Sequence, residues 1–285
     1  MVSPKNLRLF TPQTRQGRLG GKTVDELLIS AGEAARRLGV SPATVQRWVD
    51  SGVLSADRTH GGHRRISLGE IRRILAAEND APAPAHIEKW LDPLLAGDAA
   101  ALKKQLVAAR RKSGNWSDVV EDIASAISEI GRRWQLGSCR IFEEHAASEA
   151  LRRSAACCCA EMPCNPTAPK AALLTVAGDR HTLGLSLSEL IVAEIGWKTL
   201  WLGDGPPVEE LEALIKTRRP DMLIVAASPA FSKRVISRYQ AGLERAAKRG
   251  KARLILAGDG QWGPSEFSRR VYRLRELGPV LSRAI

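Results

Sequence analysis

The chain lacks several features that would place it in familiar classes of protein. No apolar run is long enough to span a bilayer, and the first residues lack the apolar core of a secretion signal. No internal repeat is present, and no Ser-His-Asp arrangement, metal-hydrolase spacing or strand-preceded phosphate loop stands out. These absences predict a cytoplasmic protein that does not associate with membranes and is not an enzyme.

Cysteine is scarce and poorly spaced for structural use. There are five cysteines, and three of them are adjacent at positions 157–159. Adjacent cysteines cannot form a spaced zinc knuckle or an ordinary disulfide framework. We therefore expect reduced thiols on a helix and no structural zinc.

Positive charge is in excess. Lys and Arg total 43 against 31 Asp and Glu, which gives a net charge of +12. This balance favours an anionic polymer as partner, most simply nucleic acid. At 285 residues the chain can hold two or three small domains.

A helix-turn-helix is predicted near the N-terminus. Residues 1–27 form a basic, polar segment that predicts a disordered tail, and the pattern changes at residue 28. Helical spacing and cap residues predict one helix over 31–38 and a second over 42–50, separated by Gly39. The second helix is the expected recognition helix.

A basic hairpin follows these helices, with Gly61-Gly62 at its tip and cations on either side. Together with a third helix over 67–77, residues 28–78 resemble the winged helix-turn-helix of the MerR superfamily. The resemblance implies binding to double-stranded operator DNA. Candidate groove contacts are Thr44, Gln46 and Arg47, and candidate backbone contacts are Arg58, His63, Arg64 and Arg65.

The rest of the chain predicts two further domains. A Pro/Ala-rich linker covers residues 79–86, and residues 87–165 show four amphipathic segments that predict a four-helix bundle. Residues 166–285 alternate buried strands with helices, which predicts a flavodoxin-like doubly wound parallel sheet. Its fifth strand is weakly signalled, with Gly278-Pro279-Val280 as the only candidate. The fold class is therefore multidomain, α and α/β.

Two motifs point to a cofactor. Asp179-Arg180-His181-Thr182-Leu183-Gly184 has the form D-x-H-x-x-G and lies where the first predicted strand meets a helix. Open α/β sheets bind ligands at that edge, and Asp179 can hold one imidazole nitrogen while the other coordinates a metal. Trp134 is followed after nine residues by Glu144-His145, so that the two helices flanking this turn carry an indole and a carboxylate.

The first motif resembles that of cobalamin-binding proteins, in which this histidine is the lower axial ligand of cobalt. The second resembles the cap of the CarH/LitR family of light-responsive regulators. The resemblance implies that His181 ligates cobalt and that Trp134, Ile141, Glu144 and His145 surround the 5′-deoxyadenosyl group of adenosylcobalamin. It also implies that Asp179, Gly184, Ser228, Gly258 and Gly260 contact the cofactor from below.

Three positions depart from the family pattern. Gln135 stands where well-known members carry a histidine after the tryptophan, Ala230 replaces a leucine near Ser228, and Ala257 replaces one glycine of a Gly-Gly pair. The main hypothesis is a repressor that senses light through adenosylcobalamin and changes its oligomeric state, as a dimer or tetramer, together with its DNA affinity. The alternatives are a regulator that senses another tetrapyrrole such as a bilin, one that binds cobalamin without responding to light, and a corrinoid methyl-carrier protein.

Overall fold

The structure is a computed structural model that describes residues 26–38, 42–58, 62–77, 83–135 and 138–282. No helix within these ranges is long and apolar enough to cross a membrane. The expected basic tail, up to residue 25, and positions 79–82 of the expected linker lie outside the described residues. Helix α4 begins at Ala85, within the last two residues of the expected linker.

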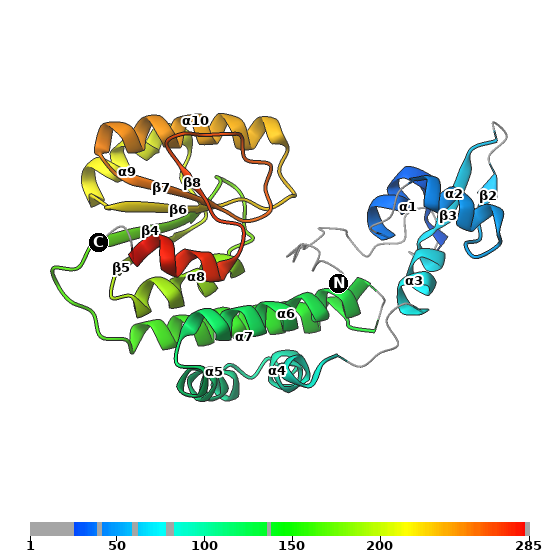
Figure 1. The fold of residues 1–285 in the computed structure, drawn as a ribbon, viewed down its shortest axis with the longest axis horizontal. Coiled ribbons are helices and arrows are strands. Elements are labelled where there is room, and N and C mark those ends of the chain that lie inside the picture. The colour runs from blue at the N-terminus through cyan, green and yellow to red at the C-terminus, as the bar shows by residue number, and fades with distance from the viewer. Residues whose placement is uncertain (1–25, 39–41, 59–61, 78–82, 136–137, 283–285) are drawn as a thin grey trace. The chain divides into compact units, whose positions relative to one another are not determined.

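The N-terminal unit is a helix-turn-helix with a small antiparallel sheet (Figure 1). Its elements are β1 (Leu28–Ser30), α1 (Ala31–Leu38), α2 (Pro42–Asp50), β2 (Asp57–Arg58), β3 (Arg64–Ser67) and α3 (Leu68–Ala77). Strand β3 pairs with β1 on one side and β2 on the other, so that β2 and β3 form the expected hairpin. Strand β1 was not predicted, because three residues carry too little alternation to be recognised.

The core of this unit follows from the helical spacing of its apolar residues. The buried members are Ala34, Ala35, Leu38, Val45, Leu54, Ile66, Ile71 and Ile74. Ser30 and Ser67 cap α1 and α3 by accepting hydrogen bonds from the Glu33 and Glu70 N–H groups, at 3.2 and 3.1 Å. Glu70 also accepts from Arg73, whose hydrogen bonds hold the pKa of Glu70 at about 2.

Four helices form the predicted bundle: α4 (Ala85–Leu95), α5 (Ala99–Ser113), α6 (Trp116–Gln135) and α7 (Ile141–Ala160). Asp98 caps α5 by accepting from the Ala100 and Ala101 N–H groups, and Gly114 ends that helix in a left-handed conformation with φ 85°. Many of the apolar residues at helical spacing are buried, with Trp90, Leu94, Leu102 and Leu106 fully enclosed. Others, such as Val107 and Ile127, are partly buried.

The C-terminal part is a five-stranded parallel sheet with helices on both faces. Its main elements are β4 (Lys170–Thr175), α8 (Leu183–Glu194), β5 (Lys198–Gly203), α9 (Leu211–Arg218), β6 (Met222–Ala226), α10 (Lys233–Gly250), β7 (Arg253–Ala257), β8 (Arg269–Arg270) and α11 (Leu277–Ser282), with short 3-10 helices at Val208–Glu210 and Leu274–Glu276. The strand order is β5-β4-β6-β7-β8, which confirms the doubly wound, flavodoxin-like topology.

The prediction for the fifth strand is wrong. Gly278-Pro279-Val280 lies inside α11, while the fifth strand consists of Arg269 and Arg270, paired with Ile255 and Leu256 of β7. A two-residue strand of arginines at a sheet edge has no hydrophobic run or alternation by which it could be recognised.

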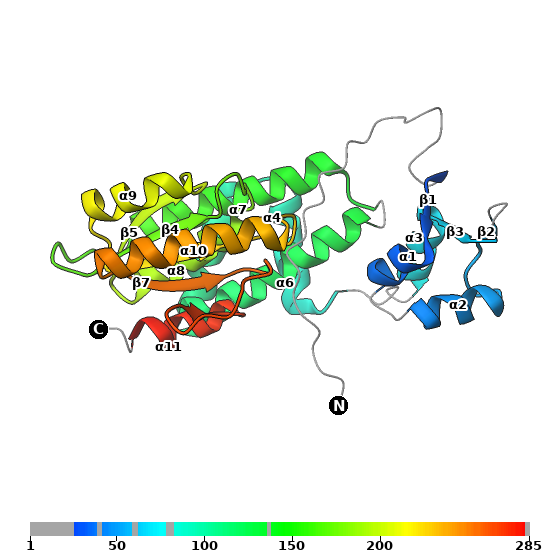
Figure 2. The same ribbon diagram turned by 90° about the horizontal axis from the view of Figure 1, so that it is seen from above.

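The bundle packs on the face of the sheet that α8 covers, and α7 lies along α8 (Figures 1 and 2). The two helices run in the same direction in both views. The first turn of α7 therefore lies at the side where the parallel strands end, which is the edge at which open α/β sheets bind ligands.

Candidate functional site

The D-x-H-x-x-G loop joins the end of β4 to the start of α8. The Nδ1 atom of His181 lies 2.6 Å from Oδ1 of Asp179, and the His181 N–H also donates to this oxygen at 3.1 Å. The His181 side chain is 27% exposed, whereas Asp179 is buried at 1%. This carboxylate–histidine pair fixes the ring, and Nε2 is then the nitrogen that can ligate a metal.

Asp179 is anchored from a second strand. Its Oδ2 accepts a hydrogen bond of 2.6 Å from the N–H of Ser228, which follows β6. Burial raises the pKa of Asp179, but the hydrogen bonds from His181 and Ser228 outweigh it and the pKa lies below its usual range. The carboxylate is therefore charged and held in place, as a partner of a metal-bound imidazole needs to be.

The neighbouring loops are close-packed, and they leave one polar atom unsatisfied. Within the described residues the Oγ of Ser228 is buried and has no hydrogen-bond partner. Gly258 has φ +79°, and a Cβ added there would lie 2.5 Å from the carbonyl oxygen of Ala227; one added at Gly260 would lie 2.5 Å from the Ala227 Cβ. The two glycines are therefore needed for the packing of their loop against Ala227, and the buried Ser228 hydroxyl is the polar group of this edge that fits contact with a cofactor.

Two further residues hold this edge and were not among the predicted site residues. The hydroxyl of Thr175, at the end of β4, donates to the carbonyls of Asp179 and Gly203, and Asp204 accepts from the Gly178 N–H at 2.7 Å. Neither belongs to a local motif, and a polar residue that ends a buried strand was the only available signal.

The residues predicted to cap the cofactor lie at the ends of α6 and α7. Ile141, Glu144 and His145 are in the first turns of α7, and Trp134 is in the last turn of α6. Glu144 is 15% exposed and accepts from the Ser148 hydroxyl at 2.9 Å, while His145 is 71% exposed with its Nε2 at 3.6 Å from Glu144. Phe142, between them, is 62% exposed and was not predicted to have a role.

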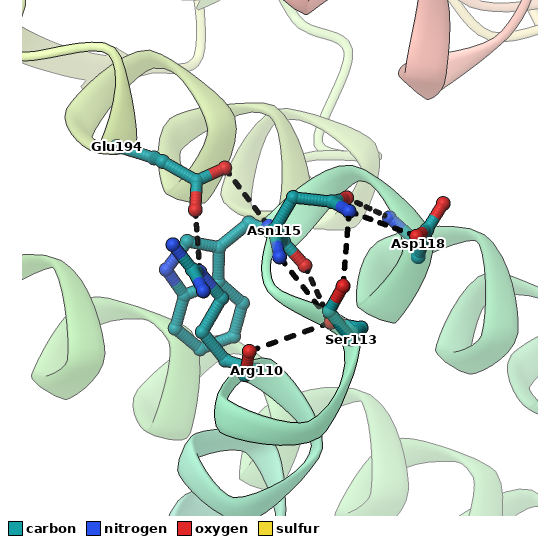
Figure 3. A network of polar contacts seen from close by, with 6 residues as sticks. Arg110, Ser113, Asn115, Asp118 and Glu194 are labelled. Carbon is teal, nitrogen blue, oxygen red and sulfur yellow. Dashed lines mark hydrogen bonds and ion pairs between the residues drawn. The ribbon is translucent and has the colours of Figure 1, made fainter.

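The far end of α8 joins the sheet to the bundle, as Figure 3 shows. Glu194 accepts a hydrogen bond from Arg110 of α5, and its other oxygen accepts from the Trp116 N–H at the start of α6 at 2.8 Å. Beside it, Asn115 accepts from the Asp118 N–H at 2.8 Å, as an N-cap does. Helix α8 therefore runs from the His181 loop to the point where α5 and α6 meet.

We expect Glu194→Gln to weaken this joint. The amide keeps one acceptor but loses the charge that pairs with Arg110 in a partly buried setting, so the loss is about 1–3 kcal/mol of unfolding free energy. Urea unfolding measures it. Glu212→Gln is the matched control, because Glu212 pairs with Arg249 at side-chain exposures of 52% and 70%, where the loss is below about 0.5 kcal/mol. Equal losses of unfolding free energy in the two variants would show that the contacts of Glu194 with α5 and α6 do not stabilise the protein.

The predicted DNA contacts lie on α2 and on the β2–β3 hairpin. Gln46 and Arg47 are exposed on α2, and Arg47 donates to the Thr44 hydroxyl at 3.3 Å. Arg64 pairs with Asp50 at the end of α2, so that it fixes the hairpin to the recognition helix. Of the remaining candidates, His63 is exposed and Arg65 is partly buried, whereas the side chain of Arg58 lies outside the described residues.

Comparison with known proteins identifies two of the domains. A family model described as a helix-turn-helix domain matches residues 28–79, and one described as a B12 binding domain matches residues 86–157. The HTH-type transcriptional repressor CarH of Myxococcus xanthus is 21% identical over 226 residues, which cover 67% of this chain and 75% of the relative.

The fold has a counterpart among solved structures. The monomethylamine corrinoid protein of Methanosarcina barkeri aligns with a TM-score of 0.52 at 13% identity, covering 69% of this chain and 97% of that one. The chain therefore carries a helix-turn-helix domain ahead of a B12-binding domain, and in sequence it is similar to the CarH repressor.

Proposed function

We propose that this protein is a transcriptional repressor that senses light through adenosylcobalamin held between the helical bundle and the sheet. The observation that carries the proposal is the His181–Asp179 pair at the carboxyl edge of the sheet, in a chain that also has a helix-turn-helix domain. The protein is proposed to act by binding DNA and not as an enzyme.

The sheet side of the site would hold the cofactor from below. His181 would ligate cobalt through Nε2, with Asp179 fixing the ring. Gly184, in the first turn of α8, would allow the corrin to approach closely. The Ser228 hydroxyl would meet the nucleotide tail, and Gly258 and Gly260 would contribute backbone atoms alone while their loop packs against Ala227. Bound adenosylcobalamin supplies a cobalt–carbon bond that light cleaves.

The bundle side follows the family resemblance. Trp134 would cover the adenosyl group, Ile141 would pack against it, and Glu144 would accept a hydrogen bond from it. Gln135 cannot serve as the second histidine ligand seen in well-known members. His145, whose side chain is 71% exposed, or water is the candidate for that role after illumination.

Helix α8 offers a route from the site to the bundle. It begins two residues after His181 and ends at Glu194, which holds the ends of α5 and α6 together. A shift of the His181 loop would therefore change how the bundle is held. We propose that the dark, loaded form assembles as a dimer or tetramer and binds the operator through several heads, because linked heads gain effective concentration.

The test is to load the full-length protein with adenosylcobalamin in the dark and to measure its mass by light scattering, and its operator binding, before and after green light. We expect the assembly to dissociate and DNA affinity to fall on illumination. Protein loaded with methylcobalamin, which lacks the adenosyl group, is the control and should not form the dark assembly. An assembly of unchanged mass after illumination would refute light sensing.

The second candidate function is a regulator that does not respond to light or that binds another tetrapyrrole. The departures from the family pattern at Gln135 and Ala257 favour it. The visible absorption spectrum of protein purified with added cobalamin or bilin decides which tetrapyrrole is bound, because a bilin and a corrin absorb at different wavelengths. A corrinoid methyl carrier would transfer a methyl group from methylcobalamin to an acceptor, and the helix-turn-helix domain argues against that activity.

A further inference from the structure

Two helices of the sheet domain end in residues that are unusual for their backbone conformation. Arg219 follows α9 with φ 48°, and Lys251 follows α10 with φ 57°. They are the only non-glycine residues with positive φ in the described part of the chain. Glycine is the usual residue there, and a side chain costs about 1 kcal/mol. The helix dipole favours cations near a C-terminus, but it does not require one at the left-handed position itself.

The two residues line the same cleft at the amino-terminal edge of the sheet. This cleft is also lined by Lys216 and Arg249, from the last turns of α9 and α10, and by two carboxylates, Glu212 and Asp221, of which Glu212 pairs with Arg249. An adjoining hollow shares Lys251 and is lined by Lys248, Arg253 and Arg269. Strands β6 and β7 begin here, at Met222 and Arg253, whereas the His181 loop lies at the edge where the strands end. The cofactor site therefore does not account for these cations.

The charge of this region is not balanced. Residues 216–253 contain eleven Lys and Arg but only two acidic residues, and residues 166–285 carry a net charge of +7 out of the +12 of the whole chain. Lys216, Arg219 and Lys251 are exposed, and none of them pairs with a carboxylate within the described residues. Uncompensated cations repel one another unless an anion lies between them.

We propose that this basic edge, formed by Lys216, Arg219, Lys248, Lys251, Arg253 and Arg269, binds the phosphate backbone of DNA beside the site held by the helix-turn-helix. The inference rests on the proposed DNA-binding function and extends it to a second surface. Contact with a phosphate backbone requires only cations that can reach it. A protein partner would favour an exposed apolar centre. The large apolar residues that line the two clefts are buried or half-buried, and the side chains exposed there are mainly the cations.

The test is the double variant Arg219→Gly and Lys251→Gly in the full-length protein. Glycine relieves the left-handed conformations, so we expect unchanged or slightly higher stability. On operator DNA with long flanks, the slope of log K against log salt should become shallower by about 2, with a loss of affinity on the order of tenfold to a hundredfold at about 0.1 M salt. On a short duplex that covers only the helix-turn-helix site, the variant should match the wild type.

Arg234→Ala with Arg238→Ala, in the first half of α10, is the control with the same loss of charge. It should leave the slope unchanged. An unchanged slope in the Arg219/Lys251 variant, or an equal loss in the control, would overturn the inference. A third variant, Arg47→Ala on the recognition helix, tests the proposed DNA-binding function independently of the basic edge. If operator binding does not depend on Arg47, the proposed function itself fails, whatever the basic edge does.

Discussion

His181→Ala is expected to lower adenosylcobalamin affinity by about a hundredfold or more, since even loss of a residue that only supports a metal ligand costs 10–100-fold. The imidazole is the candidate donor to cobalt, and alanine leaves no replacement on the loop. The side chain is 27% exposed, so its removal should leave the sheet folded. Equilibrium dialysis measures the affinity, and the visible spectrum reports the axial ligand.

Two further variants test whether the loss of cofactor affinity is specific to His181. Asp179→Asn keeps the size of the side chain but removes the charge that faces Nδ1 of His181, and should cost about 10–100-fold in affinity. His86→Ala removes an exposed imidazole near the start of α4 that has no proposed contact with the cofactor, and it should retain the cofactor. An absorption spectrum of the loaded His181 variant identical to that of the wild type would show that cobalt is not ligated by this residue.

Local pattern was enough to predict most of the fold. The helices α1 and α2 follow from apolar spacing with serine and proline at their starts, and the buried run that forms β6 is bounded by Pro220 and Ser228. The elements that were missed or misplaced, β1 and β8, have three and two residues, and their existence depends on the strands beside them. Pairing across a sheet is a tertiary effect that a segment of this length does not encode.

The candidate site, like the fold, has a part that local sequence predicts and a part that depends on distant residues. The motif gives Asp179 and His181 because they are two residues apart, and the edge of the sheet follows from the alternation of strands and helices. The N–H of Ser228 that anchors Asp179 lies 49 residues away, and Glu194 bonds to the Trp116 N–H across 78 residues. Ser228 was predicted only through family resemblance, as a cofactor contact, and Glu194 was not predicted. Neither role is readable without the folded chain.

Gly258→Ala is expected to destabilise the sheet domain by about 2–4 kcal/mol, the sum of a left-handed conformation and a steric overlap. The added Cβ would lie 2.5 Å from the Ala227 carbonyl oxygen and 3.1 Å from the Ala227 nitrogen, both backbone atoms. That carbonyl also accepts from the Gly260 N–H at 2.8 Å, so the loop cannot move away without losing this bond. Chemical denaturation measures the loss.

Gly196→Ala separates the two contributions. Gly196 has φ +86°, but a Cβ there would meet nothing within 4 Å, so its cost is the conformational one alone, about 1 kcal/mol. The excess at Gly258 therefore measures the close approach to Ala227. Because Ala227 precedes Ser228, whose N–H bonds to Asp179, the same displacement should weaken cobalamin binding in Gly258→Ala and leave it unchanged in Gly196→Ala. If both variants lose stability equally and both retain cofactor, the contact between these loops does not support the His181 site.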